Sequence, residues 1–165
     1  MNARNQSLPE LLDGLTGQEC TAILNSVGSI LLIDIGPLGR GPHQLHDSPA
    51  QGWRSLLIDS PWRIECPAGV VCDWNADNSV DGEMARCIAS LVGRTVERCC
   101  AFPPAWDLRV SFSGDLHLVV FSDSDAGRRH SWTILGTDGL EVVAGPALDP
   151  PGWAVSWSTA VPGAS

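Results

Sequence analysis

The 165-residue sequence lacks features that would place it in several common functional classes. It has no run of 18 consecutive apolar residues, so no membrane-spanning helix is expected. Residues 1–10 lack the apolar core of a secretory signal. Lys and Arg total 10 against 19 Asp and Glu, the net charge is -9, and the longest basic run is Arg128-Arg129. Because phosphate binding needs clustered cations, we expect no nucleic-acid partner. The absence of a long apolar run and of a signal core leads us to expect a cytoplasmic protein with no membrane partner.

Sequence motifs of catalysis are also missing. The chain has no nucleophile elbow, phosphate-binding loop, dinucleotide fingerprint or His-Glu-x-x-His helix. It has no Cys-x-x-Cys pair, so neither a zinc ribbon nor a thioredoxin-type site is indicated. We therefore expect no cofactor, and an enzyme is less favoured than two non-catalytic classes of function. The cysteines are expected to be reduced and mostly buried: Cys20, Cys66, Cys72, Cys87, Cys99 and Cys100.

Tyrosine is absent, whereas seven tryptophans, 17 glycines and 12 prolines are present. Trp supplies a large buried area, so a core built on Trp is the simplest interpretation. The many Gly and Pro residues are typical of short strands joined by tight turns. Trp74, Trp153 and Trp157 stand apart from the strongest strand patterns, so they are possible exposed contact positions, with core packing as the favoured alternative.

Hydrophobic periodicity predicts a mainly β chain. From Asp107 to Phe112 apolar and polar residues alternate, Ser113-Gly114-Asp115 supplies a turn, and residues 116–121 are nearly all apolar. This pattern predicts a β-hairpin, followed by a strand over 132–134. Strands are also predicted over 20–24, 29–35, 53–59, 62–66 and 70–74.

Two short helices are predicted among these strands. Ser7-Leu8-Pro9-Glu10 has the spacing of a capping box, so a helix should run over 8–13 and end at Gly14. In the second helix one apolar face consists of Met84, Cys87, Ile88 and Leu91, with Asp81 or Ser79 as the N-cap.

The strand pattern occurs twice. Corresponding residues agree in order, spacing and type: Leu15-Thr16-Gly17 with Leu91-Val92-Gly93; Leu31, Ile33 and Ile35 with Leu108, Val110 and Phe112; Leu56 and Ile58 with Val119 and Phe121; Trp62-Arg63-Ile64 with Trp132-Thr133-Ile134; Gly69 with Gly139; and Val70-Val71 with Leu140 and Val142. We therefore predict an α+β, mainly β fold: two similar antiparallel β-meander units, each preceded by a short helix, packed with pseudo-two-fold symmetry.

These boundaries divide a single domain, 1–165, into four parts. The repeats cover about 8–74 and 84–146, with a linker at 75–83 and a C-terminal tail at 147–165. In the tail, Trp153, Val155 and Trp157 fall on alternate positions after Pro150-Pro151. The tail is therefore either a last strand over the sheet or an arm with an exposed aromatic face.

A resemblance rests on these repeated motifs. The chain shows Leu-x-Gly, then Asp-Leu-x-Val-x-Phe, then Val-Val-Phe, then Trp-x-Ile with a later Gly, over residues 8 to 146. In this it resembles small duplicated bacterial proteins of unknown function, and it is loosely similar to the short acidic immunity proteins of toxin systems. The resemblance implies a protein-binding role and brings no catalytic residues.

The segment 73–83 resembles a metal-binding loop in its spacing. Oxygen-bearing side chains, including Asp73, Asp77 and Asp81, occur at alternate positions, as in a calcium loop. However, Asn78 stands where the sharp turn needs Gly, and Met84 stands where a bidentate Glu is needed. The favoured alternative is an acidic linker that ends in a helix N-cap.

A second group of potential ligands lies at 43–47. His43 and His46, with Asp47, could present two imidazoles and a carboxylate to a transition metal. No helical spacing fixes their geometry and no further ligand is near in sequence, so no metal is expected. An exposed polar loop is favoured, and because this loop is the largest insertion relative to the second repeat, it is a reasonable contact site for a partner.

Two classes of function remain. The first is a non-catalytic protein-binding, immunity-like module whose acidic surface takes a basic protein partner, with a homodimer as a further possible assembly. The alternative is a small-ligand or carbohydrate-binding domain that uses the cleft between the repeats and the spare Trp residues.

Overall fold

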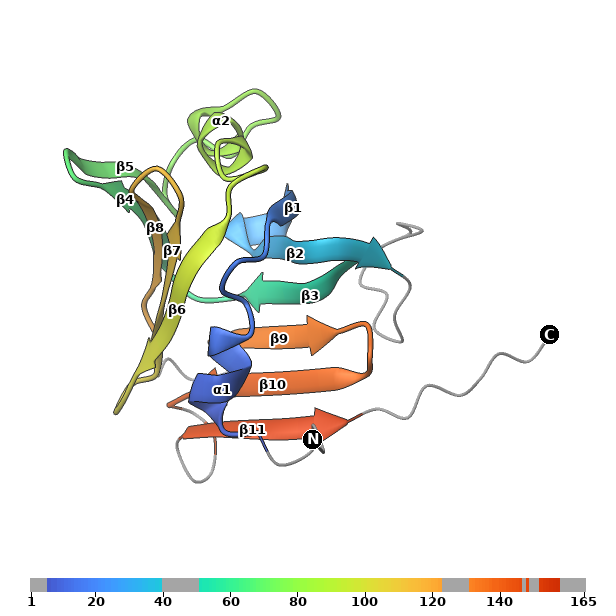
Figure 1. Cartoon of the computed structure of the whole chain (residues 1–165). Helices are drawn as coiled ribbons and strands as arrows, with labels where there is room; N and C mark the ends of the chain where they lie inside the picture. The colour runs from blue at the N-terminus through green and yellow to red at the C-terminus, as the bar shows by residue number, and fades with distance from the viewer. Residues whose placement is uncertain (1–5, 40–50, 123–130, 147, 149–151, 158–165) are drawn as a thin grey trace.

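The structure is a computed structural model that describes residues 6–39, 51–122, 131–146, 148 and 152–157. The chain is mainly β, with two antiparallel sheets and two short α-helices (Figure 1). The elements in chain order are α1 (Leu8–Asp13), β1 (Cys20–Asn25), the 3₁₀ turn η2 (Val27–Ser29), β2 (Leu31–Gly39), β3 (Gln51–Ile58), β4 (Trp62–Cys66), β5 (Gly69–Asp73), α2 (Glu83–Ala89), β6 (Val96–Phe102), β7 (Asp107–Phe112), β8 (Leu116–Val120), β9 (Trp132–Gly136), β10 (Leu140–Gly145) and β11 (Gly152–Trp157).

Each sheet contains strands from both halves of the chain. The six-stranded sheet has the order β1-β2-β3-β9-β10-β11, and the five-stranded sheet has the order β5-β4-β8-β7-β6. The sequence pattern predicts that each half forms its own meander, and this part of the expectation is wrong. The first half leaves its sheet after β3, so that Ile58 pairs with Trp132, and Trp62 pairs with Val120 of β8.

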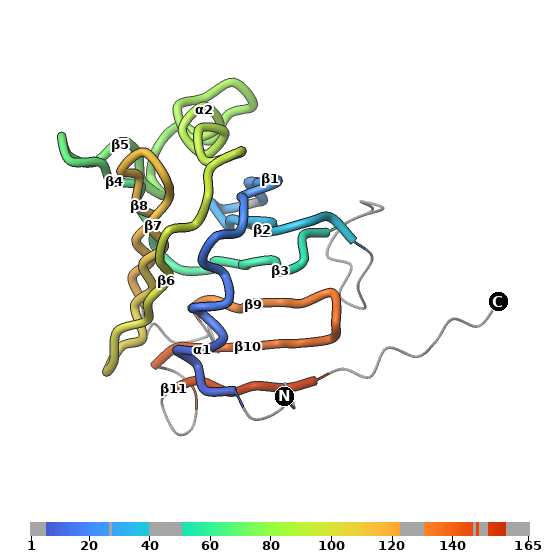
Figure 2. The backbone as a smooth tube through the Cα atoms, in the orientation of Figure 1, coloured from blue at the N-terminus to red at the C-terminus, as the bar shows by residue number. Residues whose placement is uncertain are grey.

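The two sheets meet where β1 and β6 begin. An isolated antiparallel bridge joins Glu19 to Thr95. Val96 N donates to Gln18 O at 2.8 Å, and Gly17 N donates to Val96 O at 2.8 Å. The tube in Figure 2 shows these two chain segments rising side by side. This short pairing ties the first half of the chain to the second at one corner of the fold.

Both predicted helices form, and the start of the second differs from the prediction. Ser7 N and Ser7 Oγ donate to Glu10 Oε2 at 2.7 and 2.8 Å, at the predicted start of α1. The N-cap of α2 is Gly82, not Asp81 or Ser79. The hydroxyl of Ser79 is instead bonded to Asp77, two residues before it. Leu91 lies beyond the end of α2 and is nevertheless fully buried.

The sequence pattern does not reveal β6, and it leaves two alternatives for β11. β6 was not predicted, because a register shift between Val96 and Arg98 interrupts its alternation. β11 pairs with β10 from Gly145–Gly152 to Leu140–Trp157, so the tail is a strand over these residues and not a loose arm. Trp153, Val155 and Trp157 are half-buried and pack against the core.

The core lies between the sheets and includes two completely buried tryptophans. Trp62 and Trp132 are 0% exposed. The indole Nε1–H of Trp62 donates to Ser29 O at 2.8 Å, and that of Trp132 donates to Trp106 O at 2.7 Å. Both acceptor residues have positive φ, 68° and 67°. A buried indole N–H needs a partner, so each Trp is satisfied by a carbonyl at a sharp turn just before a strand.

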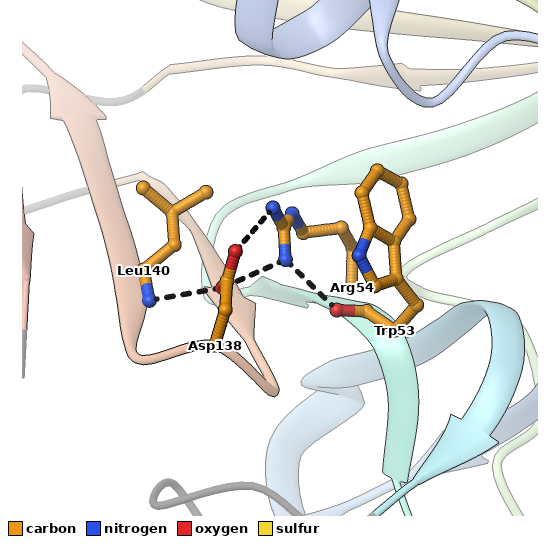
Figure 3. Close-up of polar contacts among 4 residues, drawn as sticks. All are labelled: Trp53, Arg54, Asp138 and Leu140. Atoms are coloured by element: carbon orange, nitrogen blue, oxygen red, sulfur yellow. Dashed lines mark hydrogen bonds and ion pairs between the residues drawn. The ribbon is translucent and has the colours of Figure 1, made fainter. Parts of the chain in front are cut away.

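An ion pair holds the turn between β9 and β10 against β3 (Figure 3). Arg54 Nη1 and Nη2 donate to the two carboxylate oxygens of Asp138 at 2.9 and 3.0 Å. The guanidinium carbon lies 4.1 Å from the ring centroid of Trp53, and Nη1 also donates to Trp53 O at 3.1 Å. This two-pronged geometry is the strong form of an Arg–carboxylate contact.

We expect Trp132→Ala to lower the free energy of unfolding by about 3–5 kcal/mol, because it removes a fully buried aromatic ring and leaves a cavity. Urea unfolding followed by circular dichroism measures this change. Trp74→Ala is the matched control: Trp74 is 44% exposed, so its loss should cost less than about 1 kcal/mol. A cost below about 1 kcal/mol for Trp132→Ala would contradict its place in the core.

Candidate functional sites

The predicted metal ligands fall into two groups with different outcomes. His43 and His46 lie outside the described residues, so the structure does not place them. In the part of the chain that the structure describes, no three His, Cys, Asp or Glu side chains gather as potential metal ligands. Over the same residues, no helix has the length and apolar character needed to cross a membrane.

In the segment 73–83 the carboxylates bond to the segment's own donors. Asp73 Oδ1 accepts a hydrogen bond from Asn75 N at 2.8 Å. Asp77 accepts bonds from Ser79 N and Ser79 Oγ, both at 3.0 Å, and these donors hold the pKa of Asp77 below its ordinary value. Met84 N donates to Asp77 O at 3.0 Å as α2 begins. This bonding favours the interpretation of an acidic linker that leads into a helix.

Exposed apolar side chains concentrate on and after β5, which is an edge strand of the five-stranded sheet. Among the described residues, eight large apolar side chains are exposed, and half of them lie within residues 70–80. They are Val70 (58% exposed), Val71 (40%), Trp74 (44%) and Val80 (91%). Together with the carboxylates of Asp73, Asp77, Asp81 and Glu83, we call these residues the β5–α2 surface. Apolar groups gathered in this way are characteristic of contact sites.

Trp74 is held firmly although its ring is exposed. Its backbone N donates to Trp62 O at 3.0 Å, and its carbonyl accepts the Ser29 hydroxyl at 2.7 Å. These bonds tie Trp74 to the same two residues that share the buried indole bond of the first half. These bonds fix the backbone from which the exposed ring projects, and Trp is among the residues that most often dominate interface energies.

The rim of the β5–α2 surface is acidic. Asp77, Asp81 and Glu83 are exposed and Asp73 is half-buried. The guanidinium of Arg86 donates to the carbonyl of Asp81, so one cation lies among these four carboxylates. The surface therefore keeps a net negative charge, which attracts a cationic partner.

A separate apolar groove lies between α1, β6 and β11. Its volume is about 600 Å³, within the range of small-molecule sites. Most of its lining is apolar, with charged groups near the rim: Leu8, Pro9, Glu10, Leu12, Asp13, Arg98, Cys99, Cys100, Ala101, Pro103, Trp106 and Trp153. Trp153 was a predicted contact position and lines this groove. Trp106 was not predicted, because its role depends on β6, which the sequence pattern does not reveal.

The remaining predicted contact position, Trp157, belongs to β11 and packs against the core. The structure therefore places five of the eight predicted contact positions at two surfaces. Trp74 and the acidic residues belong to the β5–α2 surface, while Trp153 belongs to the groove. Val70, Val71 and Val80 were not predicted as contacts. The repeat pattern matches Val70 and Val71 to Leu140 and Val142, and no sequence signal shows that β5 lies at a sheet edge.

Most of the thiols are buried as expected. Cys20, Cys72, Cys87 and Cys99 are buried, and only Cys66 and Cys100 are partly exposed. Burial, together with the nearby Asp34 and Glu19 carboxylates, raises the pKa of Cys20 to about 12. The hydrogen bond with Cys87 and burial likewise raise the pKa of Cys72. These protonated, enclosed thiols are inert.

Comparisons with protein-family models, curated proteins and solved structures gave no match. The resemblance to duplicated bacterial proteins and to immunity proteins therefore stays a prediction.

The hydrogen bonds of Asp77 predict its titration. Because its charged form is stabilised, its carboxyl should titrate below the ordinary value of 3.8. The stability it contributes is present above that value and is lost as the pH falls through the lower folded-state pKa. Carboxyl carbon shifts in an NMR pH titration measure this value. Ser79→Ala removes the hydroxyl donor but keeps the backbone N–H, so the Asp77 midpoint should rise part of the way toward 3.8. An unchanged midpoint would show that the Ser79 hydroxyl does not contact Asp77 in solution.

Proposed function

We propose that the chain is a non-catalytic protein-binding module whose β5–α2 surface takes a basic protein partner. The observation that carries this proposal is the concentration of exposed apolar side chains, half of those in the described residues, within residues 70–80. Two carboxylates, Asp73 and Asp77, lie in this segment and two more, Asp81 and Glu83, follow it, so the surface combines apolar contact area with negative charge. An interface of this kind has an apolar centre and a charged rim.

The geometry of the surface suits a macromolecule better than a small ligand. β5 presents an unpaired sheet edge, which a partner strand or loop can follow. Trp74 supplies an exposed aromatic side chain on a hydrogen-bonded backbone at one end of that edge. The carboxylates attract a cationic protein over a distance and orient it on approach. A partner with basic residues around an apolar patch matches both features.

The same charges argue against a second copy of the chain as the occupant. In a symmetric dimer built on this surface, equivalent patches face each other. The carboxylates of Asp77, Asp81 and Glu83 would then lie against their own copies, and like charges repel. A basic partner is therefore favoured over a homodimer at this site.

An immunity-like role is the specific form of this proposal. The resemblance named above links short acidic bacterial proteins to the neutralisation of toxins by direct binding. We place this role in the cytoplasm, where thiols stay reduced, and all six cysteines of the chain are free. The toxin would be the basic partner of the β5–α2 surface.

We further propose that the fold is an internal duplication with pseudo-two-fold symmetry. Three observations support it. β1-β2-β3 is extended by β9-β10 in one sheet, just as β6-β7-β8 is extended by β4-β5 in the other. Trp62 and Trp132 make the same kind of buried indole bond to a positive-φ residue. The buried pair Leu56 and Ile58 is matched by the buried pair Leu118 and Val120, one residue before the predicted Val119 and Phe121.

A second candidate function rests on the groove between α1, β6 and β11. Its size and its two tryptophans, Trp106 and Trp153, suit an apolar or aromatic small ligand. Sugars need many polar partners, and only Glu10, Asp13 and Arg98 carry charge in the lining, so a carbohydrate is less favoured.

The protein-binding proposal predicts a charge- and Trp74-dependent complex. Affinity capture from lysate and culture fluid of the source organism, at low and high salt, should yield a stoichiometric basic protein with the wild-type chain. Trp74→Ala and the double variant Asp77→Asn, Asp81→Asn should each reduce capture at least about tenfold. Phe102→Ala is the control: Phe102 is also exposed, at 51%, but lies on the opposite edge strand. Capture that survives both surface changes, or that Phe102→Ala also abolishes, would contradict the proposal.

The groove predicts a fluorescence response to apolar ligands. Because Trp106 and Trp153 line it, a bound aromatic or aliphatic compound should change the intrinsic Trp emission. Trp153→Phe should remove a large part of that change, whereas Trp74→Phe, outside the groove, should not. A screen in which the response follows Trp74 instead would place the ligand on the β5–α2 surface.

A further inference from the structure

A second, smaller pocket lies on the outer face of the five-stranded sheet, where β6 and β7 run side by side. Its volume is about 150 Å³, and it is lined by Arg98, Cys100, Phe102, Arg109 and Ser111. The strand register sets this composition: Arg98 pairs with Ser111, and Cys100 pairs with Arg109. Side chains of directly paired residues point to the same face of a sheet, so two guanidinium groups flank one thiol.

The pocket carries positive charge in an otherwise acidic protein. Arg98 Nε donates to Cys100 Sγ at 3.1 Å. Among the described residues, no carboxylate lies within ion-pair distance of Arg98, and the nearest carboxylate oxygen to Arg109 is Glu65 Oε2 at 3.9 Å. Arg98 is thus available to an anionic molecule that enters the pocket, and Arg109, which also faces Glu65, adds a second positive charge.

Cys100 differs from the other thiols in this setting. Four of the others are buried. Cys66, the only other partly exposed thiol, ends β4 directly after the carboxylate of Glu65 and has no guanidinium as its strand partner. The reactive form of a cysteine is the thiolate, and partly exposed thiols beside Arg are the ones that react.

We propose that Cys100 is a thiol–disulfide exchange site for small acidic disulfides such as glutathione disulfide, whose carboxylates are held by Arg98 and Arg109. The Cys100 thiolate attacks one sulfur of the disulfide, and a new S–S bond forms as the original S–S bond breaks. The departing half leaves as a thiolate and takes a proton from solvent. The acidic disulfide is the oxidant: one thiol of the protein and one disulfide become one mixed disulfide and one free thiol.

Charge complementarity selects the acidic disulfide over a neutral one. A pocket of about 150 Å³ accommodates the sulfur and one carboxylate-bearing arm, while the rest of the molecule lies in solvent. Arg98 and Cys100 also line the larger groove, so a group attached to Cys100 would reach its rim. The site is separate from the β5–α2 surface, since β6 and β5 are opposite edges of the sheet.

The test compares the rates at which two aromatic disulfides of different charge react with the folded chain. Dithiobis(nitrobenzoate) carries two carboxylates, and dithiodipyridine is neutral. We expect one fast-reacting thiol with the anionic reagent, lost in Cys100→Ser and kept in Cys66→Ser. Arg98→Gln and Arg109→Gln should each slow the anionic reagent by about tenfold and the neutral one by less than about twofold. Added salt should slow only the anionic reaction.

Three outcomes would overturn the proposal. The fast thiol could prove to be Cys66, the Arg variants could slow both reagents equally, or the rates could be independent of salt. Mass spectrometry after treatment with glutathione disulfide gives a second measurement, with the adduct expected on the peptide containing Cys100. Urea unfolding curves of each variant show that it is folded. Because partner capture does not enter this test, its failure leaves the protein-binding proposal intact, and the reverse also holds.

Discussion

The two buried indole hydrogen bonds are the constraint on which the rest of this structure depends. Trp62 and Trp132 each begin a strand just after the chain has passed from one sheet to the other. A fully buried Trp ring is stabilised when its N–H finds an acceptor, and for these two rings the acceptors are the carbonyls of Ser29 and Trp106. Each bond joins the start of one strand to the turn before another strand, far away in sequence. The crossing strands are thereby locked in register.

This crossing decides where the molecule is open to contact. Strands from the two halves pair in the middle of each sheet, β3 with β9 and β4 with β8. This arrangement leaves β5 and β6 as the edges of the five-stranded sheet. Edge strands carry unpaired backbone groups, and proteins usually blunt or use them. Here α2 contacts β5 and α1 contacts β6, yet both edges keep exposed side chains. The exposed side chains at the β5 edge form the β5–α2 surface, and those at the β6 edge line the pocket at Cys100.

Local patterns in the sequence predict much of the fold but not its assembly. Alternation finds β7 and β8, the capping box finds α1, and the spacing of Trp62 and Trp132 identifies core positions. The pairing of β3 with β9 joins residues far apart in sequence, and the local pattern of neither strand predicts which strand it pairs with. The bulge at Val96–Arg98 conceals β6, and with it both the groove and the Cys100 pocket. Trp74 and its acidic neighbours were predicted because composition marks them, whereas Val70 and Val71 resemble the core residues Leu140 and Val142.

The difference between Val70 and Leu140 shows why a matching pattern does not give matching burial. β10 lies between β9 and β11, whereas β5 has a neighbour on one side only. Charged side chains are also distributed unevenly over the five-stranded sheet. Carboxylates gather beside β5, whereas Arg98 and Arg109 lie on β6 and β7, toward the opposite edge. Charges farther apart than about 8 Å are largely screened at physiological salt, so each site responds to its own neighbours. In a chain with a net charge of -9, the basic partner proposed for β5 and the anionic disulfide proposed for Cys100 therefore depend on different local charges.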